Sequence, residues 1–178
     1  MAALPDLITV DQFRQLPDDG NYCYELHHGK AVAMTWPKPG DWKLRRHVMD
    51  LLRRKLSDFG EAAVAVPYRA VPEFDIRAAD VALISRERWD AIDPEDDVYG
   101  APELVIQLIS ASDTKADLQE TVALCLASGA LECWLVDRKR KSITVVRKDG
   151  AASVYEGDTA IPPSAFGSDS LHLSDIFE

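Results

Sequence analysis

Residues 102–113 read PELVIQLISASD, and this short stretch decides how the rest of the chain is interpreted. A single glutamine, Gln107, stands among five apolar residues, Leu104, Val105, Ile106, Leu108 and Ile109. A short apolar run bounded by turn residues is typical of a strand that is buried in a sheet. Such a strand normally excludes glutamine, because the hydrogen-bonding positions of its amide all need partners there. Gln107 is therefore either a core amide that bonds neighbouring strands or a residue retained for a function.

The residues that follow predict a helix and a second buried strand. The strand 103–110 leads into a helix over 114–128, for which Ser112 or Asp113 is the expected N-cap. The apolar run ECWLVD at 132–137 then gives another strand. This order predicts a βαβ crossover in which the two strands are parallel and buried.

Further strands and helices are predicted on both sides of this unit. His28-Gly29 marks the tight turn of a hairpin, because glycine accepts the positive φ that such a turn needs. Apolar residues recur at helical spacing in 42–58, and Thr9 and Gln12 have capping-box spacing at the start of a short helix. The remaining predictions are strands at 63–68, 80–85 and 142–147, a charged connector EFDIRAA at 73–79, a helical turn in the acidic loop 86–101, an edge strand at 152–157 and a terminal turn at 174–178. Together they predict a mixed α/β fold around one central sheet.

The composition is that of one globular domain. The chain has 178 residues, 47% hydrophobic and 28% charged, so it is long enough to bury a sizeable core. No apolar run reaches the length of a membrane span, and the first ten residues lack the basic start and apolar centre of a signal peptide. Cys23, Cys125 and Cys133 have no CxxC spacing, which argues against a structural zinc site and a disulfide framework. We therefore expect a cytoplasmic protein that does not contact a membrane.

The net charge of −10 argues against extensive contact with nucleic acids, whose binders usually carry a basic surface. Any DNA binding must therefore use a local basic patch. The segment 41–58 is the candidate, since six basic residues there outnumber three acidic ones and leave a local charge of +3. Such a run is either a solvated helix face or a surface that contacts phosphates.

Two more polar residues stand where apolar ones are expected. Asp80 opens the strand DVALIS, and Glu25 interrupts YCYELHH. Buried carboxylates are costly unless they are paired or bind a metal, and oxygen ligands suit Mg²⁺ or Mn²⁺. Each residue also has a structural interpretation: Asp80 as the cap of a turn before its strand, and Glu25 as the partner of an arginine that holds the hairpin.

An ordered set of segments resembles a known family. YELHHGKAVAM, Arg46-His47, ADVALIS, PELVIQLISASD and ASGALECWLVD follow one another as in a group of bacterial restriction-endonuclease-like proteins of the PD-(D/E)XK superfamily. The resemblance covers about residues 20–147, with 1–19 as an N-terminal helical extension of a single domain 1–178. It implies a restriction-endonuclease-like core, in which helices flank a central mixed sheet.

The resemblance also implies roles for individual residues. Asp80 falls on the metal-binding aspartate, Glu25 on the glutamate of the hairpin, and Gln107 on a second metal-binding position where the family has glutamate. Thr121 follows Glu120 where the family has a lysine. Two further departures are Cys125 for a tyrosine and Ala79 for the proline before the aspartate. The expected DNA contacts are Lys43, Arg45, Arg46, His47 and Lys115, and Lys115 is also a candidate replacement for the missing lysine.

The resemblance thus implies a Mg²⁺-dependent (or Mn²⁺-dependent) endonuclease for DNA phosphodiester bonds with a degenerate active site. Asp80 and Gln107 would hold the metal weakly or not at all, because hard cations prefer carboxylates to amides. The alternative is a catalytically inactive protein of the same fold that binds DNA or a protein partner, or forms a homodimer. No GxSxG, HExxH or glycine-rich phosphate loop is present, so a serine hydrolase, a zinc protease and a nucleotidase lack support.

Overall fold

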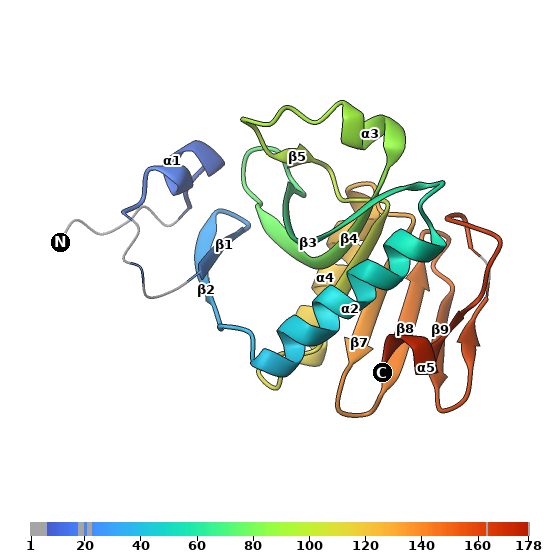
Figure 1. The fold of residues 1–178 in the computed structure, drawn as a ribbon. Coiled ribbons are helices and arrows are strands. Elements are labelled where there is room, and N and C mark those ends of the chain that lie inside the picture. Colours follow the sequence, from blue (N-terminus) through green and yellow to red (C-terminus); the bar gives the residue numbers. More distant parts are fainter. Residues whose placement is uncertain (1–6, 18–19, 21–22, 163, 178) are drawn as a thin grey trace.

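The computed structural model describes residues 7–17, 20, 23–162 and 164–177, so parts of the predicted N-terminal extension and Glu178 lie outside the described residues. Within them, a seven-stranded mixed sheet has the order β5-β3-β4-β6-β7-β8-β9 (Figure 1). Its strands are β3 Gly60–Arg69, β4 Arg77–Ser85, β5 Val98–Tyr99, β6 Leu104–Leu108, β7 Glu132–Asp137, β8 Ser142–Arg147 and β9 Ala152–Glu156. The predicted fold class is confirmed, and so is the position of β9 at the edge of the sheet.

The crossover predicted at residues 103–137 forms the centre of the sheet. β6 and β7 are parallel, with Leu108 opposite Val136, and α4 (Lys115–Ala127) connects them. β4 pairs with β6 in the antiparallel direction. The predicted N-cap of α4 is wrong: Thr114 takes that place, because it forms a complete capping box with Asp117.

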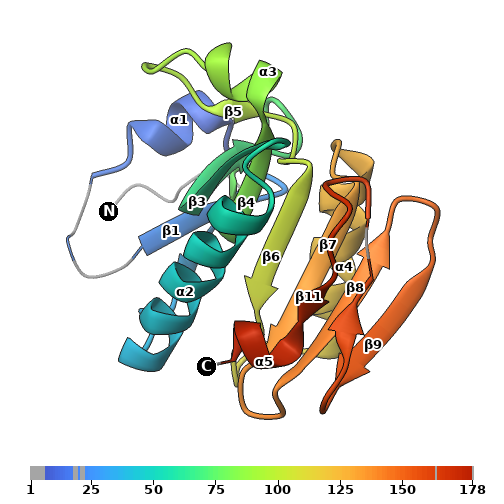
Figure 2. The ribbon, with the colours of Figure 1, turned by 45° about the vertical axis from the view of Figure 1, so that its right-hand side comes forward.

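Helices cover both faces of this sheet (Figure 2). α2 (Pro39–Lys55) and α5 (Leu173–Ile176) pack on one face and α4 packs on the other. α2 begins at Pro39 rather than at residue 42, because proline at the first helical position has a preset φ and lacks only an N–H that has no helical partner. The core on this face includes α2 residues at helical spacing, Leu44, Val48, Leu51 and Leu52. None of the helices in the described part of the chain is long and apolar enough to cross a membrane.

The hairpin and the short first helix form as predicted. β1 (Cys23–His27) and β2 (Lys30–Met34) make a separate two-stranded sheet, and the φ values of His28 and Gly29 are 49° and 76°. Thr9 and Gln12 form the capping box of α1 (Val10–Arg14). The hairpin is tied to the main sheet by an isolated antiparallel bridge between Leu26 and Ile76.

The connector predicted at 73–79 is wrong, because its last three residues begin β4 and two of its charged residues are buried. Arg77 donates to Oδ1 of Asp75 from Nε at 3.2 Å and from Nη2 at 3.1 Å. Burial of the two charges is tolerated because they are paired and hydrogen-bonded.

The C-terminal residues complete the core beyond the region of family resemblance. β10 (Ala160–Ile161) pairs with β11 (Leu171–His172), and Ile161, Leu171 and Leu173 are buried in the core under α2. The helical turn predicted within 86–101 is α3 (Arg86–Asp90), and the terminal turn is α5.

Candidate active site

Asp80 and Gln107 lie next to each other on two neighbouring strands. The Asp80 amide donates to Oε1 of Gln107 at 3.3 Å, and Nε2 of Gln107 donates to the Ala78 carbonyl at 2.9 Å. The Leu108 amide in turn donates to Oδ2 of Asp80 at 2.6 Å. Gln107 is therefore a partnered amide that joins β6 to β4, which explains how a glutamine is accommodated between buried apolar residues.

Glu25 reaches the same part of β4 from the hairpin. Its Oε1 accepts the Ala78 amide at 3.3 Å, and its Oε2 lies 2.8 Å from Nε2 of His27. The predicted arginine partner of Glu25 is wrong, since a histidine and a backbone amide take that place. The structure thus brings the three predicted site residues together along Ala78–Asp80.

Arg45 supplies the positive charge of this site. Its guanidinium projects from α2 and forms an ion pair with Oδ1 of Asp80. Arg45 and Asp80 are both largely buried, with side chains 22% and 14% exposed. Nε of Arg45 is also buried and has no hydrogen-bond partner within the described residues. The sequence alone did not indicate this ion pair. Arg45 was instead predicted to contact DNA.

The Asp80 carboxyl is difficult to ionise despite this pairing. Burial raises its pKa from 3.8 to about 6, and the negative charges of Glu25 and Asp113 act in the same direction. Arg45 and the Leu108 amide lower the pKa but do not offset the burial. Near neutral pH, Asp80 is therefore a carboxylate whose charge is balanced by a neighbouring cation rather than by solvent.

The backbone is irregular at this point of the sheet. The β3–β4 ladder pairs Val64 with Val81 and Val66 with Ala79, and it skips the pair of Ala65 and Asp80. Ala65 has a φ of 51°, a left-handed conformation that is unusual for a residue other than glycine. The turn-cap interpretation of Asp80 is wrong, because Asp80 lies inside β4. Strained backbone of this kind often accompanies functional sites.

The donors of the site do not fit a Mg²⁺ or Mn²⁺ ion in this arrangement. Magnesium sites use carboxylate oxygens together with water and substrate phosphates. Here both oxygens of Asp80 are engaged, Gln107 is neutral, and the Arg45 cation would repel a metal. Across the residues that the structure describes, no three His, Cys, Asp or Glu side chains gather closely enough to hold a metal ion.

Glu120, which precedes the position of the missing lysine, belongs to a different ionic cluster. Glu120, next to Thr121, accepts from Nη2 of Arg77 at 2.8 Å and lies 3.1 Å from Nε2 of His28. These contacts hold the pKa of Glu120 below its usual value. Asp75 and Arg77 complete the cluster, which the sequence analysis missed. Asp75 and Arg77 are two residues apart, so in a strand their side chains lie on the same face. Two opposite charges at this spacing were the sequence signal for their ion pair.

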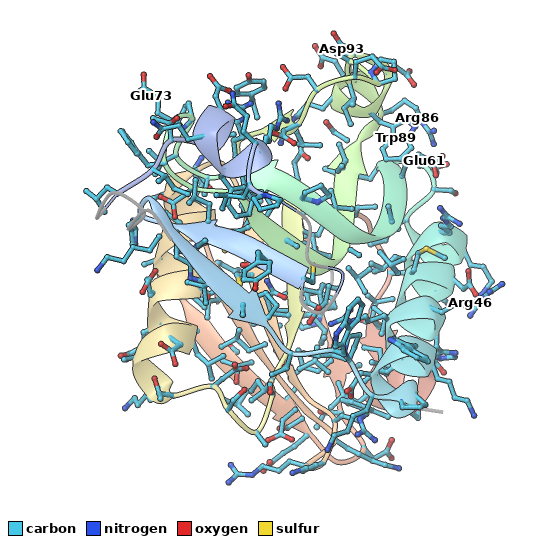
Figure 3. All side chains as sticks on the ribbon, turned by 90° about the vertical axis from the view of Figure 1, so that its left-hand side faces the viewer. Arg46, Glu61, Glu73, Arg86, Trp89 and Asp93 are labelled. Carbon is cyan, nitrogen blue, oxygen red and sulfur yellow. The ribbon has the colours of Figure 1, made fainter. Side chains whose placement is uncertain are left out.

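The predicted DNA contacts separate into two groups. Lys43, Arg46 and Lys115 are exposed, and Figure 3 shows Arg46 projecting from α2 into solvent. Arg45 and His47 point inward, Arg45 to Asp80 and His47 to the Asp175 carbonyl of α5. His47 therefore joins α2 to the C-terminal helix.

Comparisons with known proteins agree with this architecture. A search of curated proteins found no match. The crystal structure of a "putative nuclease belonging to DUF820" from Anabaena variabilis ATCC 29413 has a TM-score of 0.81, with 18% identity and coverage of 96% of this chain and 97% of that one. At this identity the likeness shows the fold. A family model described as "Putative restriction endonuclease" matches residues 10–174, nearly the whole chain. The chain therefore belongs to the Uma2 family of restriction-endonuclease-like proteins.

Proposed function

We propose that this chain is a nuclease-fold protein that binds DNA and retains a degenerate phosphodiesterase site at Asp80. The observation that carries the proposal is the ion pair between Asp80 and Arg45. In a metal-dependent nuclease site the aspartate needs a divalent cation as its partner. In this chain an arginine of α2 already provides the positive charge, and the second predicted ligand is a neutral amide with two backbone partners.

Two of the departures from the family pattern, at positions 107 and 121, remove charges that would act on the transition state. Glutamine at position 107 removes a negative charge from the metal site, and threonine at 121 removes a cation. Loss of one electrostatic contributor typically lowers a catalytic rate by about 10²–10³-fold. Two such losses, if independent, correspond to about 10⁴–10⁶-fold, so we propose DNA binding rather than hydrolysis as the function.

An active Mg²⁺- or Mn²⁺-dependent endonuclease is the second candidate. It is favoured by the convergence of Asp80, Gln107 and Glu25 on one short segment beside the strained Ala65. In that case DNA binding would have to displace Arg45 from Asp80 and leave the carboxylate free.

Two measurements test these candidates with the full chain. The first is nicking of supercoiled plasmid in Mg²⁺ and then in Mn²⁺ by wild type, Asp80→Ala and the double variant Gln107→Glu/Thr121→Lys. The second is the binding of a fluorescent DNA duplex, followed by anisotropy. We expect wild type to bind DNA without nicking it, and Asp80→Ala purified in the same way controls for contaminating nucleases.

The outcomes separate the candidates. If wild type nicks the plasmid and Asp80→Ala does not, the chain hydrolyses DNA at this site. That result would overturn the proposed loss of activity and establish the endonuclease. Nicking by the double variant alone would show that the scaffold is intact and that the two replaced residues account for the loss. Absence of DNA binding at low salt would overturn the proposed function itself.

A further inference from the structure

The turn between β7 and β8 brings a run of basic residues to one end of α2. A cavity of about 320 Å³ lies between the two elements, and its lining includes Lys43, Arg138 and Lys141. Gly40, Leu44 and Phe177 supply the rest of the lining. Arg138 is fixed there by its ion pair with Asp41, in which Nε lies 2.9 Å from Oδ1. Three of the six residues that line this cavity are therefore basic.

These residues form a strongly positive surface on a negative protein. We define the basic edge as Lys43, Arg138, Lys139, Arg140 and Lys141, all of which are exposed. Five basic residues stand against two acidic partners, Asp41 and Asp137, so the local charge is +3 in a chain of −10. In the part of the chain that the structure describes, the ammonium groups of the three lysines have no hydrogen bond or ion pair. Hydrogen bonds and ion pairs within the fold therefore do not explain why the three lysines are concentrated here.

The basic edge lies at the same end of the sheet as Asp80. The Leu108 amide contacts Asp80, Leu108 is opposite Val136 in the parallel pair, and Arg138 follows two residues after Val136. With about 4.8 Å between strands and about 3.3 Å per residue, the backbones at Asp80 and Arg138 are roughly 12 Å apart. This is about the rise of three to four base pairs along a DNA duplex.

We propose that the basic edge binds the phosphate backbone of DNA beside the Asp80 site, with one phosphate received between Lys43, Arg138 and Lys141. This inference rests on the proposed DNA binding and states where the DNA lies. Lysine and arginine neutralise phosphates and release their counterions, and cations around a hollow concentrate the local field. Lys141 also has a φ of 51°, a conformation in which glycine or asparagine would be more usual.

A matched pair of triple variants tests the basic edge in the full chain. Lys43→Gln/Lys139→Gln/Lys141→Gln removes three charges from it, and Arg54→Gln/Lys55→Gln/Lys148→Gln removes three exposed charges from the opposite ends of α2 and β8. Affinity for a fluorescent duplex is measured by anisotropy from 50 to 200 mM salt. We expect the first variant to bind at least 10-fold more weakly at low salt, with a salt slope smaller by about 3, and the control to retain the wild-type slope.

Each outcome decides the inference. If both variants lose the same affinity for the duplex, or neither loses any, the basic edge is not the DNA-binding surface. Binding by wild type would still establish that the protein binds DNA. Absence of DNA binding by wild type would overturn the proposed function and this inference together. Binding to vesicles that contain anionic lipid but not to DNA, lost in the first variant, would assign the surface to a membrane and overturn it as well. Circular dichroism and thermal melting of both variants control for folding.

Discussion

Replacing Asp80 with asparagine tests whether burial or the Arg45 ion pair controls this carboxyl. The pKa of Asp80 is raised from 3.8 to about 6, because burial outweighs the lowering by Arg45 and the Leu108 amide. Asparagine has nearly the same shape and its oxygen can still accept the Leu108 amide, but it does not titrate. The two proteins should therefore differ in how their stability depends on pH.

The sign of this dependence follows from proton binding. Between pH 3.8 and about 6 the folded protein binds more protons at Asp80 than the unfolded chain does. The protonated carboxyl thus favours folding below pH 3.8, and that contribution is lost as the pH rises through 6. The full effect is about 3 kcal/mol, of which about 2 kcal/mol falls between pH 4.5 and 7.5. Relative to wild type, the unfolding free energy of Asp80→Asn should rise by about 2 kcal/mol across that interval.

Urea unfolding of both proteins at several pH values measures this difference, because all other titrating groups are shared. Asp50→Asn, the same change at a half-buried position of α2 whose side chain is 43% exposed, sets the baseline for the substitution. A difference that does not change with pH would mean that Arg45 cancels the effect of burial. A difference that falls as the pH rises would mean that the ion pair dominates, and the reasoning from burial would be refuted.

Three further variants test other parts of the structure by denaturant unfolding. The free energy of unfolding of Arg77→Met should be about 3–5 kcal/mol lower than that of wild type, because the fully buried Asp75 loses its cation. The double variant Arg77→Met/Asp75→Asn should recover part of this free energy. The free energy of unfolding of Gln107→Leu should fall by about 1–3 kcal/mol, because two backbone groups of β4 lose their side-chain partner. An unchanged free energy of unfolding would show that water replaces the glutamine side chain as their partner. Gly60→Ala should not be recovered folded, since the new Cβ would lie 1.8 Å from the Ile84 carbonyl oxygen, and a normal circular dichroism spectrum would contradict this.

The elements that could be predicted from the sequence are those whose signal is local. The crossover at 103–137 was predicted correctly because its two strands are short, largely apolar runs, and turn and capping residues separate them from the helix between them. The turn at His28-Gly29 was recognisable because few residues accept positive φ. The connector at 73–79 was misread for the opposite reason. Its charges indicated exposure, whereas Asp75 and Arg77 neutralise each other inside the fold.

The location of the candidate site was also predictable, but its electrostatics were not. Polar residues inside apolar strands marked Asp80 and Gln107, and strand pairing alone was enough to bring them together. The partner of Asp80 depends instead on how α2 crosses the sheet. Along a helix, successive basic side chains point in different directions, so Arg45 faces Asp80 while Lys43 and Arg46 face solvent. No spacing rule in a basic run identifies which member turns inward.

The ion pair between Arg45 and Asp80 changes how the replacements at positions 107 and 121 are interpreted. A glutamate at position 107 would be the third carboxylate beside Asp80 and Glu25, and the excess of negative charge over Arg45 would attract a divalent cation. With glutamine at position 107, Arg45 balances Asp80 and Glu25 is the second carboxylate nearby, so the site attracts a divalent cation less strongly. The loss of the glutamate and the ion pair of Asp80 with Arg45 are therefore parts of one arrangement. We propose that this arrangement preserves the fold around Asp80 without the metal that the family pattern implies.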